Sequence, residues 1–145
     1  MRKYGAPPHV ISTALGMSET GAGSIYNLDY QRYDVQNMQQ FCCLGRCLPG
    51  IEMRVTIPNA DDESAQAPAN ELGFLEVCGP IVFKGYFNNK SATTASFTPD
   101  GYFRTGDHST IDRAGMLHLV GMTNDTMNIN SVKHLSIELE AAIEE

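Results

Sequence analysis

The sequence predicts a strand-rich, mixed α/β fold dominated by a twisted antiparallel sheet. Residues 51–57 alternate apolar and polar side chains with the period of two that is typical of a half-buried strand. Other short β-branched or aromatic runs are separated by turns that contain glycine, proline or aspartate. Little helix is expected before the C-terminal stretch at residue 137, so the chain is expected to be strand-rich.

Two strands are expected in the first part of the chain. Residues 9–15 are a β-branched run that ends at Gly16, which predicts a buried strand that leads into a loop. Residues 21–40 are polar and aromatic without clear periodicity, and we expect them to be irregular. Residues 43–50 are rich in turn-forming residues, so they are expected to be a connector to the strand at residues 51–57.

Shorter elements are expected in the middle of the chain. Residues 58–70 favour a surface loop, and strands are expected at residues 73–78 and 81–84. A short helix is expected to begin near Asn89. Residues 98–101, Thr-Pro-Asp-Gly, predict a turn.

A hairpin and a helix complete the expected fold. Segments 107–112 and 116–120 flank a turn at residues 113–115, which predicts two paired strands. Ser136 is expected to cap a helix over residues 137–144. No internal repeat is visible, and no shift in composition marks two independent domains.

Composition excludes some classes of partner. With 145 residues, of which 42% are hydrophobic, the chain is long enough for a domain with its own core. Its net charge of −7 argues against a nucleic-acid or anionic-membrane partner, because both require a basic surface. The first residues contain no apolar stretch suited to a signal peptide or a membrane span, so a cytoplasmic location is expected.

Cysteine spacing gives little sign of a metal site. Cys42, Cys43, Cys47 and Cys78 do not form the two closely spaced ligand pairs of a typical zinc site. Reduced thiols, partly buried, are therefore expected.

Residues 16–20, Gly-Met-Ser-Glu-Thr, form the first candidate site. A glycine-bearing loop after a strand lets the backbone N–H groups of Gly16 and Met17 approach a phosphate closely. Ser18 offers a hydroxyl group to a phosphate oxygen, and Glu19 offers the kind of oxygen that Mg²⁺ prefers. The structural alternative, that these residues merely cap a helix, is about equally compatible with this motif alone.

Residues 100–107, Asp-Gly-Tyr-Phe-Arg-Thr-Gly-Asp, form the second candidate site. A β-turn before a strand explains Asp100 and Gly101 but leaves Thr105, Gly106 and Asp107 unexplained. The second motif therefore favours a functional role.

Both motifs resemble signatures of the AMP-forming adenylating enzymes, which include acyl-CoA synthetases, adenylation domains of peptide synthetases and luciferases. Residues 100–107 match the pattern D-G-[WY]-[FL]-x-T-G-D at every defined position. The resemblance implies that Asp107 accepts hydrogen bonds from both ribose hydroxyls, which a carboxylate is able to do. It also places Ser18 where the family has a phosphate-binding threonine and Glu19 on the magnesium-binding glutamate.

Two further segments resemble the family with departures. Residues 73–86 resemble G-E-L-x-V-x-G-P-x-V-x-x-G-Y, a structural segment, with Phe74 in place of the glutamate. Residues 119–125 resemble L-x-G-R-x-[DK]-[DE], but Met122 replaces the arginine and Asn124 replaces the hinge residue. Because methionine lacks the cationic donors of arginine, that contact is not carried over to this chain.

The resemblance implies that residues 1–121 are the C-terminal part of a large adenylate-forming domain, with an α/β edge at the N-terminus. Residues 122–145 would then be the hinge and the start of a small domain. The implied function is one segment of a ligase that activates a carboxylic acid with ATP and Mg²⁺ and transfers it to the thiol of CoA or of a carrier-protein phosphopantetheine. The family's phosphate loop and late lysine have no match here, so the chain is expected to be inactive alone.

Two alternatives remain open at this point. One is a non-catalytic nucleotide-binding or interaction module. The other is a serine hydrolase, because residues 16–20 approach the G-x-S-x-G nucleophile elbow, with Ser18 as nucleophile and Asp107 with His118 or His134 as partners.

Overall fold

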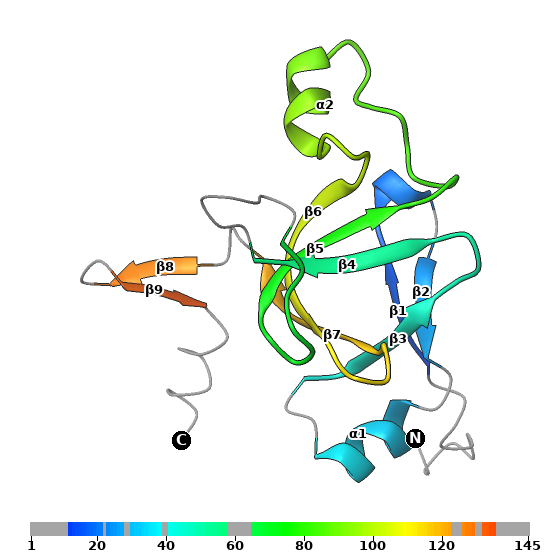
Figure 1. Cartoon of the computed structure of the whole chain (residues 1–145), viewed down its shortest axis with the longest axis vertical. Helices are drawn as coiled ribbons and strands as arrows, with labels where there is room; N and C mark the ends of the chain where they lie inside the picture. Colours follow the sequence, from blue (N-terminus) through cyan, green and yellow to red (C-terminus); the bar gives the residue numbers. More distant parts are fainter. Residues whose placement is uncertain are drawn as a thin grey trace, which may run out of the picture.

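A computed structural model describes residues 12–21, 23–27, 30–38, 41–57, 65–122, 126–129 and 132–135. These residues form a curled antiparallel sheet with two short α-helices outside it, as Figure 1 shows. The strand-rich architecture with a twisted antiparallel sheet is therefore confirmed.

The main sheet has seven strands in the order β1-β2-β3-β7-β6-β5-β4, and each neighbouring pair is antiparallel. Only β1-β2-β3 and β4-β5-β6-β7 follow chain order, so the pairing of β3 with β7 joins two distant parts of the sequence. The strands are β1 (Thr13–Gly16), β2 (Gly23–Asn27), β3 (Cys43–Cys47), β4 (Glu52–Thr56), β5 (Gly73–Cys78), β6 (Phe103–Ile111) and β7 (Leu117–Met122).

The core lies on one face of this sheet and is contributed by five of its strands. Its buried apolar side chains are Ile25, Val55, Leu75, Val77, Phe103 and Leu117. Burying a side chain of this size contributes about 1.5–3 kcal/mol, and Ile25 on β2 joins the first three strands to this cluster.

Two α-helices lie outside the sheet. In α1 (Tyr30–Asn37), Tyr33 donates a hydrogen bond to Asp112, and Asp34 accepts one from the backbone N–H of Cys43 at 3.0 Å. These contacts attach α1 to β3 and to the turn between β6 and β7. In α2 (Lys90–Ser96), the side chain of Asn89 accepts a hydrogen bond from the N–H of Ala92, which is the expected N-cap.

Some expected elements are confirmed and others are wrong. The strands at β4 and β5, the helix after Asn89 and the β6–β7 hairpin are confirmed. The irregular region expected at residues 21–40 contains β2 and α1, and the connector expected at residues 43–50 contains β3. Residues 81–84, expected to be a strand, form a loop whose apolar side chains Val82 and Phe83 pack against the core instead of pairing.

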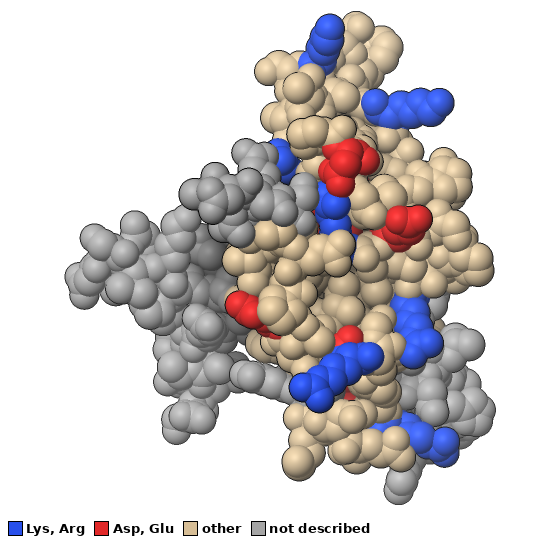
Figure 2. Space-filling model, viewed as in Figure 1, with Lys and Arg blue, Asp and Glu red and all other residues tan. Residues whose placement is uncertain are grey.

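A second, two-stranded sheet follows, made of β8 (Thr126–Ile129) and β9 (Val132–Leu135). The helix expected over residues 137–144 and the hinge residue Asn124 lie outside the described residues. Within the described ranges, no helix has both the length and the apolar character needed to cross a membrane. Figure 2 shows charged side chains of both signs dispersed over the face that it draws, without a basic patch.

Candidate functional site

The first candidate site is a tight turn at the end of β1. Ser18–Thr20 form a single turn of 3-10 helix, and the backbone of Met17 before it is extended. The hydroxyl of the buried Thr20 donates to the carbonyl of Met17 at 3.0 Å, and Gly21 closes the turn with a φ of 66°. Thr20 therefore has a structural role, while Ser18 is exposed and Glu19 is half-buried.

Glu19 is held by the loop that follows β5. Its carbonyl accepts a hydrogen bond from the N–H of Phe83 at 2.7 Å. Its carboxylate oxygen Oε1 accepts a second one from the hydroxyl of Tyr86 at 3.0 Å. The turn that carries the carboxylate is thus fixed by both its backbone and its side chain.

The second candidate site is a bulge in β6. Phe74 pairs with His108 and Glu76 pairs with Arg104, so Leu75 alone faces residues 105–107. The hydroxyl of Thr105 donates to the carbonyl of Leu75 at 3.0 Å and accepts from the N–H of Asp107 at 3.1 Å. Gly106 has a φ of 81°, a left-handed conformation that glycine adopts without strain. Thr105 and Gly106 therefore stabilise the backbone of the bulge, and Asp107 lies at its end.

Asp107 at the end of the bulge is only 6% exposed. Burial raises the pKa of its carboxyl group, and the Thr105 hydroxyl and the neighbouring His108 oppose that shift. A carboxylate whose pKa is raised by burial is a functional-site candidate. Across the sheet, Asp107 pairs with Met122, whose side chain is 54% exposed.

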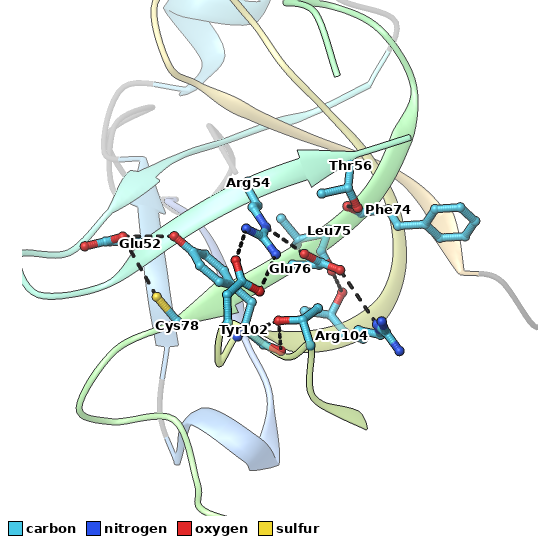
Figure 3. A network of polar contacts seen from close by, with 12 residues as sticks. Glu52, Arg54, Thr56, Phe74, Leu75, Glu76, Cys78, Tyr102 and Arg104 are labelled. Carbon is cyan, nitrogen blue, oxygen red and sulfur yellow. Dashed lines mark hydrogen bonds and ion pairs between the residues drawn. The ribbon is translucent and has the colours of Figure 1, made fainter. Parts of the chain in front are cut away.

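A buried ion cluster lies beside the start of this motif and joins β4, β5 and β6 (Figure 3). Arg54 is 9% exposed, and its Nε donates to Glu76 at 2.7 Å. Its two terminal nitrogens donate to the two oxygens of Asp100 at 2.6 and 3.0 Å. Glu76 also lies 3.8 Å from Nε of Arg104.

The cluster fixes the turn at residues 98–101 against the sheet. The ring of Tyr102 lies under the guanidinium of Arg54, 3.8 Å from its carbon to the ring centroid, and the Tyr102 hydroxyl donates to Glu52 at 3.0 Å. Thr98 closes the turn, because its hydroxyl accepts from the N–H of Tyr102 at 2.8 Å. The bidentate contact with Arg54 and the hydrogen bond from Thr98 lower the pKa of Asp100 from 3.8 to about 2.

The two candidate sites are separate structures. Gly16, Met17, Ser18 and Glu19 are consecutive at the end of β1, whereas Asp107 lies within β6. The Glu19 carboxylate accepts a hydrogen bond from Tyr86 in the loop after β5, whereas the N–H of Asp107 donates to Thr105 within its own bulge.

A serine hydrolase would need a histidine paired with Ser18, and no described histidine is hydrogen-bonded to the Ser18 side chain. His118 is buried in β7, and its ring nitrogens lie 3.3 Å from the carbonyl of Phe41 and 3.4 Å from Asp112. His118 thus belongs to the α1 attachment, and Asp107 is not its partner. The side chain of His134 lies outside the description.

Asp34, Cys43 and His118 bring potential metal-ligand atoms within 4.8 Å of one another. Hydrogen bonds already account for their positions. The Asp34 carboxylate accepts from the N–H of Cys43, and both ring nitrogens of His118 face oxygen atoms. We therefore assign this group to the packing of α1 against β3 and β7.

Sequence reasoning missed Arg54, Glu76 and Tyr86. Arg54 occupies a polar position in an alternating strand, so the pattern predicts an exposed side chain although the structure buries it. Tyr86 ends a segment that was interpreted as structural, yet its hydroxyl reaches a candidate site residue. The Gly85-Tyr86 pair at the end of that segment was the one sequence signal that could have pointed to Tyr86.

Comparisons with curated proteins identify long fungal relatives. The chain is 47% identical over 141 residues to nonribosomal peptide synthetase apvA of Aspergillus terreus, a match that covers 97% of this chain and 15% of that protein. It is 46% identical over 145 residues to microperfuranone synthase of Emericella nidulans, covering 100% of this chain and 15% of that protein. The chain thus spans about 15% of the length of these relatives. No family model matches it.

Solved structures contain the same fold. The structure of McyG A-PCP complexed with phenylalanyl-adenylate has a TM-score of 0.80 at 29% identity and covers 99% of this chain and 22% of that one. ATP-bound MatB from Rhodopseudomonas palustris has a TM-score of 0.76 at 30% identity and covers 97% of this chain and 26% of that one. Both similar structures contain an adenine nucleotide or an adenylate.

Proposed function

Because this chain is related along its whole length to a segment of the AMP-forming adenylating enzymes, we propose that it is the part of such a ligase that holds the nucleotide. The parent reaction converts a carboxylic acid and ATP into an acyl-adenylate and pyrophosphate, and then transfers the acyl group to a thiol. In this proposal residues 1–121 belong to the large adenylate-forming domain, and the hinge and small domain begin at residue 122.

The roles follow from the chemistry of each group. Asp107 accepts hydrogen bonds from the two ribose hydroxyls, Ser18 donates its hydroxyl to a phosphate oxygen, and Glu19 binds Mg²⁺. The N–H of Gly16 would face the phosphate. The N–H of Met17 donates to Oγ1 of Thr20 at 3.4 Å within the turn, so Met17 would have to exchange that contact to reach a phosphate. The residues fit these ligands, because Ser18 is exposed and Oε1 of Glu19 is the oxygen that Tyr86 engages, which leaves Oε2 for a cation. Bound Mg²⁺ would neutralise phosphate charge.

One observation carries the proposal, namely the bulge that presents Asp107. The Thr105 hydroxyl and the left-handed Gly106 fix the backbone, and the buried carboxylate has its pKa raised by burial. Donors from a bound ligand would replace the water that burial removes. Two adjacent hydroxyls satisfy a carboxylate in this way.

The thiol acceptor is CoA or the phosphopantetheine of a carrier protein. McyG A-PCP, which shares the fold, favours a carrier protein, and the matches to nonribosomal peptide synthetases favour the same acceptor.

Titration of the full chain with AMP, followed by calorimetry, tests the proposal. We expect Asp107→Asn to weaken AMP binding by about 10- to 100-fold, because hydrogen bonds to a charged group contribute about 1.5–3 kcal/mol. Glu71→Gln is the matched control, since it removes one charge at an exposed position and should leave affinity unchanged. Equal affinity of the Asp107→Asn variant and the parent chain would overturn the ribose role.

A non-catalytic nucleotide-binding module is the second candidate, and Met122 favours it. This exposed methionine pairs across the sheet with Asp107 where the resemblance places a cationic donor. A module of this kind binds AMP but does not exchange pyrophosphate into ATP. Met122→Arg is then expected to increase AMP affinity, whereas exchange activity of a complete ligase that carries this segment with Met122 in place would favour the ligase.

A further inference from the structure

The loop after β5 makes two hydrogen bonds to Glu19, and the second is the side-chain contact from Tyr86. The N–H of Phe83 donates to the Glu19 carbonyl at 2.7 Å, and the Tyr86 hydroxyl donates to Oε1 at 3.0 Å. Glu19 and Tyr86 lie 67 positions apart in the chain, so their hydrogen bond links two separate segments.

Tyr86 is itself held on both sides of its peptide backbone. Its N–H donates to the hydroxyl of Thr93 at 2.9 Å, and its carbonyl accepts from the N–H of Asn89 at 3.2 Å. Gly85 before it has a φ of 148°, and a Cβ there would lie 2.6 Å from Cγ2 of Thr93. Glycine is therefore required for this close approach to α2.

The ring of Tyr86 also has a fixed neighbour. It meets the ring of Phe83 edge-on, with centroids 4.8 Å apart. Phe83 in turn packs edge-on against the buried Phe103 at 5.4 Å. The position of the Tyr86 hydroxyl is thus set by the core and by α2 before any ligand binds.

We propose that Tyr86 is a positioning residue that holds the Glu19 carboxylate by Oε1 and presents Oε2 to the Mg²⁺ of bound Mg-ATP. This inference rests on the proposed function, because it assumes that Glu19 is the magnesium ligand. A glutamate side chain near the surface has several rotamers, and fixing one of them before binding removes an entropic cost from metal capture.

The direction of this hydrogen bond follows from the two groups. A phenol hydroxyl donates its hydrogen and a carboxylate oxygen accepts, so Tyr86 is the donor and Glu19 the acceptor.

The test separates metal-dependent from metal-free binding in the full chain. Calorimetry would measure ATP affinity with Mg²⁺ and with EDTA, and AMP affinity with EDTA, in the parent chain and in Tyr86→Phe. We expect Tyr86→Phe to reduce the gain in ATP affinity that Mg²⁺ provides by about fivefold and to leave AMP affinity unchanged. A collapsed loop or an unfolded chain would lose AMP binding as well, and that result would overturn the positioning role.

Two further variants make the outcome specific. Tyr102→Phe removes a tyrosine hydroxyl that donates to Glu52 at the same 3.0 Å, so its Mg²⁺ effect should equal that of the parent chain. Glu19→Gln should abolish the Mg²⁺ effect. If Glu19→Gln retains it, the proposed metal ligand is wrong. If Glu19→Gln loses it while Tyr86→Phe behaves like the parent chain, only the positioning inference is wrong.

Discussion

Replacement of Arg54 by methionine tests whether the buried ion cluster holds the sheet beside the second motif. Methionine keeps much of the side-chain length and removes the guanidinium. Glu76, whose side chain is 4% exposed, would lose its 2.7 Å partner and keep only the longer 3.8 Å contact with Arg104. Asp100, with 48% of its side chain exposed, would be rehydrated. The cost therefore comes mainly from the uncompensated charge of Glu76.

The magnitude follows from that burial. Removing one partner of a buried ion pair typically costs about 3–5 kcal/mol. We expect about 3 kcal/mol here, because Arg104 still offers partial compensation, and this corresponds to roughly a 150-fold change in the folded-to-unfolded ratio. Urea denaturation followed by circular dichroism and tyrosine fluorescence measures it, since the chain has six tyrosines and no tryptophan.

A double variant distinguishes the charge mechanism from lost packing. Arg54→Met with Glu76→Leu removes the stranded carboxylate, and we expect it to be at least about 1 kcal/mol more stable than Arg54→Met alone. Arg104 then loses its contact with Glu76, but its side chain is 41% exposed and water can hydrate it. A destabilisation by Arg54→Met below about 1 kcal/mol would refute the reasoning. A double variant no more stable than the single one would do the same.

The remaining predictions concern titration, backbone strain and thiol access. Because the folded-state pKa of Asp100 is depressed, the stability that it contributes should be present above pH 4 and lost as pH falls towards 2, a loss that Asp100→Asn should remove from the acid-unfolding profile. Burial raises the pKa of Asp107, so its charge costs stability at neutral pH and Asp107→Asn should raise the melting temperature; a lower one would contradict this. Gly106→Ala should lower the free energy of unfolding measured in urea by about 1–2 kcal/mol, because alanine is strained at this positive φ. A steric clash does not add to this cost, because a Cβ there would have no atom within 4 Å. The exposed Cys42 should react with a thiol reagent in the folded chain well before the buried Cys43, and equal rates would argue against the packing of β3.

Local signals explain the part of the fold that the sequence predicted. The strand at β4, the strand at β5 and the cap at Asn89 each depend on residues within a few positions of one another. The elements that were missed depend on distant partners. β3 is a strand because it pairs with β2 and β7, and its own sequence, with Gly45 and Cys47, resembles a turn. α1 is polar, and individual hydrogen bonds to distant residues, such as that from Tyr33 to Asp112, attach it to the sheet.

The candidate site likewise has features that the sequence predicts and features that depend on distant partners. Ser18, Glu19 and Asp107 lie within short motifs, so their positions could be proposed from the sequence. The bulge that buries Asp107 could not, because it requires the register of β5 against β6. The contact between Glu19 and Tyr86 joins residues on different segments and becomes visible only in the folded chain.

The central claim is that Asp107 recognises the ribose of an adenine nucleotide, and a comparison of AMP with 2′,3′-dideoxy-AMP tests it most directly. Calorimetry would measure both affinities in the parent chain and in Asp107→Asn. We predict that the parent chain prefers AMP by about 10- to 100-fold and that Asp107→Asn binds the two nucleotides almost equally, because the carboxylate is the acceptor for both hydroxyls. The same preference in both chains would contradict the account.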